Sequence, residues 1–323
     1  MAAMPRRRRG AGAAAVGALV LVLLGALRKA STCSFAEQGV LSRRQARPEE
    51  VAVVDRGTQW TGGYNGSAAA RGDDGPRGPV SADQAIALGV PQEYAADVSK
   101  LTASLGDLDS DVTHPLMLAR FMRFLGNATE AEAMVRTSTA WRKEVDIERI
   151  MREWGVEDEE GWRRAPQSAR AALADRHFCG GRLSGAARDG SPVIVARIGL
   201  CDVAGIAREG LGDLMLNQFI FLLEETLRTV HARSVAQKRL VLSSVVIDIS
   251  GLSMNILRHM DLPRKFSNVM NLYYPDIAGT IAIVNAPFMF QTIWKVVSLL
   301  LDPATAAKVR ILGGDFGRGV GEH

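Results

Sequence analysis

Residues 273–308 decide the fold, and they read YYPDIAGTIAIVNAPFMFQTIWKVVSLLLDPATAAK. The Tyr-Tyr-Pro-Asp start predicts an extended turn, because the residue before a proline is biased away from helical backbone. The apolar run 281–284 is typical of a buried strand, and 288–301 predicts a very apolar helix. A new helix is expected at Asp302-Pro303, with the aspartate as N-cap and the proline in the first turn. This order of elements belongs to an α/β sheet.

The helix expected at 288–301 has only a narrow polar stripe, formed by Gln291, Lys295 and Ser298. A surface helix normally buries an apolar stripe roughly 100° wide, and this helix is apolar over much more of its circumference. Two interpretations stay open. The helix is either buried in an ordinary core, or it covers an apolar cavity and meets a bilayer when it swings outward.

Two polar residues beyond this helix suit an anion. Thr305 and Lys308 are three residues apart and therefore share a helix face. A hydroxyl, an ammonium and a helix N-terminus together favour a phosphate, and Asp276 is positioned in the sequence to pair with Lys308. The simpler alternatives are a solvated surface lysine and an ordinary turn aspartate.

Strand and helix patterns alternate upstream of this stretch. Strands are expected at 193–198, 240–249, 280–285 and 309–312, and helices at 211–230 and 256–271. The alternation predicts an αβα segment with a mostly buried sheet.

A small helical lobe is expected before the sheet. Helices are predicted over 111–143, broken at Gly126-Asn127, and again over 157–174. Thr129 followed by Glu132 predicts a capping box at the start of the helix after the break.

The composition of the chain limits the classes of function that it can have. The chain has 323 residues and 47% hydrophobic residues, enough for a sizeable core. Of its 39 basic and 35 acidic residues, nine and one lie in residues 1–47, so the body is mildly acidic and nucleic acid is not expected. Five scattered histidines, three cysteines without zinc spacing and the lack of a G-x-S-x-G elbow predict no enzyme and no cofactor.

The N-terminus has the pattern of a targeting segment. Arg6 to Arg9 precede an uncharged apolar run over 11–27, which predicts a signal peptide or membrane anchor within residues 1–34. A secretory route or a complex plastid is the expected destination, with the cytoplasmic face of an internal membrane as the alternative. Residues 35–82 are first basic and then glycine-rich, and they predict a disordered linker.

Nine segments of the chain resemble the CRAL-TRIO lipid-binding family. They are 120–123, 131–134, 141–143, 189–193, 247–253, 273–276, 283–288, Trp294 and 301–303, with Thr305 and Lys308 following. The resemblance implies a helical lobe at 83–175, a lipid-binding lobe at 176–316 and a tail at 317–323. It also implies that 288–301 is a gate helix over a lipid cavity floored by the sheet.

The resemblance further implies which side chains bind the lipid. Thr305 and Lys308 would hold a phosphate and Asp276 would pair with the lysine, although family members have a glutamate there. The remaining expected lipid-binding residues are Ser243, Phe288, Phe290, Ile293 and Val297. Two positions depart from the family: Leu125 lies near the place of a further arginine, and Val245 replaces a threonine.

The function expected from the sequence is binding of a phospholipid, phosphatidylinositol-like or otherwise hydrophobic, with its transfer or presentation between membranes. The expected partners are this ligand and a membrane surface, and the chain is expected to be monomeric. A membrane-sensing or protein-interaction module that transfers nothing is the alternative, and a lipid-modifying enzyme is a more distant one.

Overall fold

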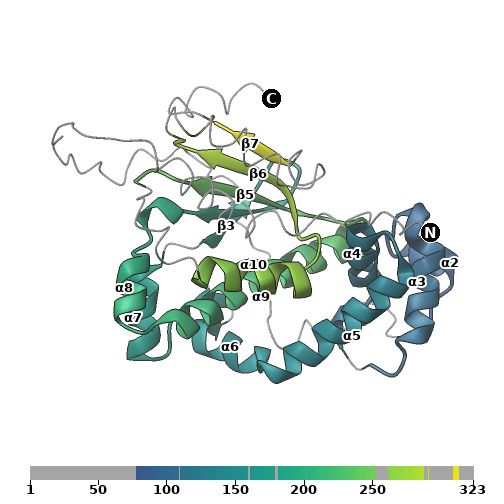
Figure 1. The fold of residues 1–323 in the computed structure, drawn as a ribbon. Coiled ribbons are helices and arrows are strands. Elements are labelled where there is room, and N and C mark those ends of the chain that lie inside the picture. Colours follow the sequence, from purple (N-terminus) through teal and green to yellow (C-terminus); the bar gives the residue numbers. More distant parts are fainter. Residues whose placement is uncertain are drawn as a thin grey trace, which may run out of the picture.

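The computed structural model shows a layer of strands with helices gathered beneath it (Figure 1). The residues that the structure describes are 78–108, 110–158, 161–178, 181–251, 261–286, 290 and 308–312. The predicted leader at 1–34 and tail at 317–323 lie outside these residues, as do most of the linker at 35–82 and all of the gate helix except Phe290.

The N-terminal part of the described chain is helical. Its helices are α2 (Ala82–Ala87), α3 (Gln92–Ser104), η1 (Asp111–Thr113), α4 (Pro115–Leu125), α5 (Ala128–Glu144), α6 (Ile147–Trp154) and α7 (Ala169–His177). The break between α4 and α5 falls where it was predicted, because Gly126 takes the left-handed conformation with φ 67° and ends α4. The predicted capping box is wrong: the Asn127 side chain caps α5 by accepting from the amides of Thr129 and Glu130.

The predicted helix over 157–174 is only partly present. Strands β1 (Gly155–Asp158) and β2 (Gly161–Arg164) form an antiparallel hairpin before α7 begins. Pro166 cannot donate the hydrogen bond that a continuous helix needs there, and Ser168 provides an N-cap that starts α7 at Ala169.

The sheet has the order β3-β4-β5-β6-β7. Its strands are β3 (Arg182–Ala186), β4 (Pro192–Ala196), β5 (Ser243–Asp248), β6 (Ala278–Val284) and β7 (Val309–Ile311). The β4 to β7 pairs are parallel, and β3 is antiparallel to β4. The predicted α/β class is therefore confirmed. The sequence did not indicate β3, because its RLSGA segment is poor in the β-branched and aromatic residues that favour strands.

Helices connect the parallel strands. They are η2 (Ile198–Leu200), α8 (Val203–Arg208) and α9 (Gly212–Gln237) between β4 and β5, and α10 (Asp261–Tyr273) before β6. The predicted helix over 211–230 is thus longer, and it ends at Lys238 in the left-handed conformation. No helix within the described residues combines the length and apolarity needed to cross a bilayer.

Two apolar clusters form the core. The larger one joins residues of the N-terminal helices, such as Phe121 and Trp154, to Phe221 of α9 and to Tyr274. The smaller one covers one face of the sheet, where Val245 and Ile281 lie in the same cluster as Phe290. On β5 the alternate residues are only half-buried, so this strand is not equally buried on its two faces. The larger cluster therefore brings Tyr274 together with residues of the N-terminal helices and of α9.

Candidate functional site

The turn between α10 and β6 positions Asp276. This residue has φ 52°, in the left-handed region that aspartate tolerates better than most side chains. It is 2% exposed although it is an acid in a turn. A carboxylate so deeply buried requires compensating cations, and the structure supplies them.

Lys308 provides the first cation, as predicted from the sequence. Its Nζ lies 3.3 Å from Oδ1 of Asp276 and donates a second hydrogen bond, of 3.2 Å, to the carbonyl of Ala278. Lys308 directly precedes β7, which pairs with β6, so neighbouring parallel strands bring the two residues together. The aspartate therefore reaches the lysine despite being one methylene shorter than glutamate.

Arg123 provides a second cation on the other carboxylate oxygen. Its Nε lies 3.3 Å from Oδ2 of Asp276, and its side chain is 38% exposed. The residue stands in the last turn of α4, where the negative end of the helix dipole stabilises a positive charge.

Arg120 supplies a third positive charge, deeper in the protein. It is fully buried, and it donates to the Asp276 carbonyl at 3.1 Å, the Ser234 hydroxyl at 2.9 Å and the Val241 carbonyl at 2.8 Å. Burial lowers the pKa of its guanidinium to about 10, with Asp276 opposing and Arg123 adding to that shift. Arg120 therefore remains charged at neutral pH and fixes the backbone of the turn.

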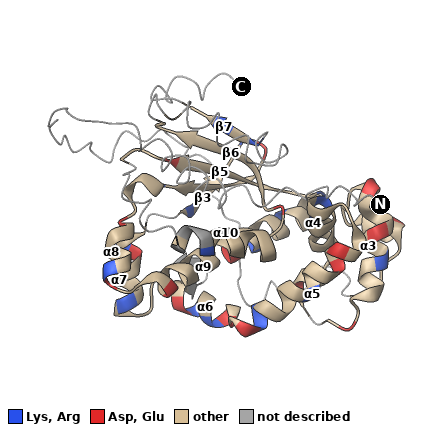
Figure 2. Ribbon diagram, viewed as in Figure 1, with Lys and Arg blue, Asp and Glu red and all other residues tan. Residues whose placement is uncertain are grey.

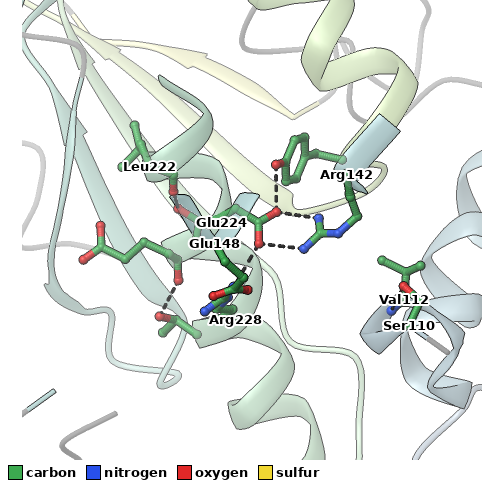
Figure 3. Close-up of polar contacts among 11 residues, drawn as sticks. Ser110, Val112, Arg142, Glu148, Leu222, Glu224 and Arg228 are labelled. Atoms are coloured by element: carbon green, nitrogen blue, oxygen red, sulfur yellow. Dashed lines mark hydrogen bonds and ion pairs between the residues drawn. The ribbon is translucent and has the colours of Figure 1, made fainter. Parts of the chain in front are cut away.

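A buried network also contacts this turn (Figure 3). Tyr274 donates from its hydroxyl to Glu224 at 2.7 Å, and Arg142 donates to both oxygens of this carboxylate, to Oε2 at 2.7 Å. Burial would raise the pKa of Glu224, but Arg142, followed by Arg228, brings it below its ordinary value. The ring of Trp141 stacks on Tyr273 at 3.9 Å between centroids, so α5 contacts both tyrosines of the turn.

The other predicted site residues are less closely connected. Ser243 is 1% exposed, and its hydroxyl donates to the Ile277 carbonyl at 2.8 Å, so a ligand there could use only its acceptor lone pairs. Phe290 is buried in the apolar cluster on the sheet. Four expected residues lie outside the described residues, and their roles stay predictions. They are Thr305, Phe288, Ile293 and Val297.

Three charged residues of this region were not given roles from the sequence. Arg120 and Glu224 are single charges within the apolar helical segments PLMLARFMRFL and FIFLLEETL, a pattern that indicates a buried, paired charge. Arg123 had no comparable signal, since a terminal arginine of a helix is usually solvated. Figure 2 shows acidic and basic residues scattered over the helices, whereas most of the sheet is uncharged. A charge in a helix is therefore common in this protein, and only its apolar sequence neighbours indicate that it is buried.

Fold and site together define a mixed α/β domain in which a mainly parallel sheet and the preceding helices meet at a buried carboxylate. Residues 182–318 match the model of the CRAL/TRIO domain family. This match confirms, over that part of the chain, the resemblance predicted from the segments around 189–193 and 273–276. The predicted boundary between lobes, at 175 and 176, stays a prediction.

The chain is also similar to longer curated proteins. "Protein real-time" of Drosophila melanogaster is 26% identical over 285 residues, which are 84% of this chain and 40% of that protein. The "SEC14 cytosolic factor" of Yarrowia lipolytica is 25% identical over 251 residues, 73% of this chain and 48% of that protein. The "Phosphatidylinositol/phosphatidylcholine transfer protein SFH12" of Arabidopsis thaliana is 26% identical over 181 residues, 54% of this chain and 31% of that protein. The chain spans less than half the length of each of these relatives.

Proposed function

We propose that this chain binds a phospholipid and carries or presents it between membranes, with the phosphate bound beside Asp276 and Lys308. The ion pair between these two residues is the observation that carries the proposal. It is supported by the relative whose name describes transfer of phosphatidylinositol and phosphatidylcholine. Thr305 would add a hydroxyl to the phosphate site, and Ser243 would be a further lipid-binding residue.

The chemistry of the pair suits a phosphate. The Lys308 ammonium is a compact point charge, and its side chain is only 15% exposed, so a phosphate interacting with it is poorly screened by water. Asp276 fixes the direction of the ammonium, and when no ligand is present it provides the counter-charge that the buried Lys308 needs.

The apolar part of the lipid would be bound by a separate surface. The helix expected at 288–301, with Phe288, Phe290, Ile293 and Val297, would act as a gate over the acyl chains. Each Å² of acyl surface removed from water would contribute about 25 cal/mol, so binding of the chains does not depend on the headgroup.

The full chain with Lys308→Ala tests this proposal. Vesicles of phosphatidylcholine with phosphatidylinositol are incubated with the protein, and the lipid bound after reisolation is measured by mass spectrometry. We expect roughly tenfold less bound phosphatidylinositol, because a charge-assisted contact is lost, and unchanged binding of hexadecane, which has no headgroup. Lys100→Ala is the matched control, since Lys100 is an exposed lysine paired with Asp97.

Three results would contradict the proposal. Equal loss of phospholipid and hexadecane would show that Lys308 supports the fold rather than the headgroup. Unchanged phosphatidylinositol binding would remove Lys308 from the site. A protein that binds lipid but moves none between vesicles would favour the alternative of a membrane-sensing module that transfers nothing.

The predicted leader makes membrane attachment part of the proposal. A signal peptide or anchor within residues 1–34 would deliver the chain to a secretory route or a complex plastid. Asn65, in the sequence Asn-Gly-Ser, is a glycosylation acceptor in the predicted linker. A mass at Asn65 that a glycosidase removes would establish passage through the endoplasmic reticulum, and a chain starting at Met1 without this mass would oppose it.

A further inference from the structure

The strongest unassigned feature is the contact between Arg123 and the predicted headgroup carboxylate. Asp276 lies between two cations, with Lys308 at Oδ1 and Arg123 at Oδ2, each 3.3 Å away. Arg123 comes from α4, far from Asp276 and Lys308 in the sequence, so only the tertiary structure brings it to the site.

The geometry of the Arg123 contact differs from that of a structural arginine in the same molecule. Arg142 donates two hydrogen bonds to Glu224 and is 14% exposed. Among the described residues Arg123 donates no hydrogen bond, and Oδ2 of Asp276, although buried, accepts none. A guanidinium that serves only to neutralise a carboxylate is expected to use its fork for two parallel hydrogen bonds. The donors of Arg123 are therefore not committed to Asp276.

The charges of the cluster also point to an anionic ligand. Among its described residues the cluster has three cations, Arg120, Arg123 and Lys308, against the single carboxylate of Asp276. Arg120 has no exposed surface, and both of its terminal nitrogens donate to acceptors within the protein. The excess positive charge that solvent can reach is thus that of Arg123, with Lys308 beside it.

We infer that Arg123 is a second phosphate-binding residue, which contacts the ligand's phosphate together with Lys308. This inference rests on the proposed function and deepens it. Arg123 and Lys308 contact the two oxygens of the same carboxylate, so a phosphate beside Asp276 would lie within reach of both cations. A planar guanidinium can bind two phosphate oxygens at once, which an ammonium cannot.

Three variants of the full chain test the inference. Arg123→Gln removes the charge and keeps a side chain suited to a helix, Arg123→Lys keeps the charge without the fork, and Lys308→Ala reports on the site itself. Arg136→Gln is the matched control, because Arg136 lies on α5 and pairs with Asp107 and Glu132 instead. The measurement is the ratio of phosphatidylinositol to hexadecane bound from separate incubations, with and without added inorganic phosphate.

We expect Arg123→Gln to lower this ratio about tenfold, Arg123→Lys to lower it less, and Arg136→Gln to leave it unchanged. If Arg123→Gln matches the control while Lys308→Ala loses phosphatidylinositol, the inference fails and the proposed function stands. If neither variant changes the ratio, both fail. Inorganic phosphate that binds in an Arg123-dependent way without displacing the lipid would assign the residue to a soluble anion and overturn the inference.

Unfolding by urea separates these effects from instability. Arg123→Gln is expected to shift the midpoint less than Arg120→Met, because the Arg123 side chain is 38% exposed and Lys308 remains as a counter-charge to Asp276. A midpoint shift as large as that of a buried arginine would show that Arg123 acts on the fold, and that outcome also overturns the inference.

Discussion

Arg120 donates a hydrogen bond from its guanidinium to the main-chain carbonyl of Asp276, over 3.1 Å and 156 residues of sequence. Helix α4 is thereby joined to the turn whose carboxylate faces Lys308. The same guanidinium also donates to Ser234 at the end of α9 and to Val241 before β5. Four segments of the chain depend on one buried side chain, and substitutions in this network should be much more costly than those of surface pairs.

Arg120→Met is expected to destabilise the protein by about 2–4 kcal/mol, because it leaves buried carbonyl oxygens without a donor. Arg136→Met, at an exposed salt bridge, should cost less than about 1 kcal/mol. Urea unfolding curves give both values from the shift in midpoint, provided that the slope is unchanged. Equal costs would mean that the Arg120 contacts add nothing to stability.

Glu224→Gln is expected to cost about 3 kcal/mol, since Arg142 loses its buried counter-charge. The pKa of Glu224 lies below its ordinary value of 4.5, because Arg142 outweighs the effect of burial. This carboxylate therefore stabilises the fold above about pH 4.5, and that contribution is lost as the pH falls through the lower folded-state pKa. Between pH 3 and 6 the free energy of unfolding should depend less on pH in the variant than in the wild type. Glu132→Gln, at a surface pair, should show the same pH dependence as the wild type.

A third prediction concerns His231, which lies edge-to-face against His114 at 4.6 Å between ring centroids. Burial, followed by the nearby charges of His114 and Arg120, lowers the pKa of His231 to about 3 from its ordinary value of 6.5. The neutral ring stabilises the fold above pH 6.5, and this contribution falls by roughly 1.4 kcal/mol per pH unit on going from 6.5 towards 3.

His231→Gln should remove this dependence, so that its stability changes little between pH 6.5 and 4.5, a range above that of Glu224. Urea midpoints at several pH values are the measurement. Parallel curves for the variant and the wild type would contradict the prediction.

The start of α5 provides a fourth prediction, which separates the sequence pattern from the structure. Asn127→Ala is expected to cost about 1 kcal/mol, because two amides at the helix start lose their acceptor. Thr129→Ala should change the stability by less than about 0.5 kcal/mol, since the threonine does not cap the helix. We therefore expect the lower thermal midpoint for Asn127→Ala. A lower midpoint for Thr129→Ala would instead support the capping box predicted from Thr129 and Glu132.

Much of the sheet could be predicted from the sequence, and the failures have local causes. Runs such as 281–284 are apolar and β-branched, and a strand in the middle of a sheet is the usual way to bury them. β3 was missed because its segment has few such residues. The helix predicted over 157–174 is wrong before Ala169, because Pro166 cannot continue a helix and the residues before it form β1 and β2.

The sequence by itself determined the α/β class and the family resemblance, because adjacent parallel strands and ordered motifs depend on near neighbours in the chain. It offered the pairing of Asp276 with Lys308 as one of two interpretations, and the structure shows that pair. Only the tertiary structure decided that Arg120, Arg123 and the Glu224 network surround the same turn. Their contacts join helices α4, α5 and α9 to residues fifty or more positions away. Such contacts depend on how buried helices pack, and no spacing in the sequence encodes that packing directly.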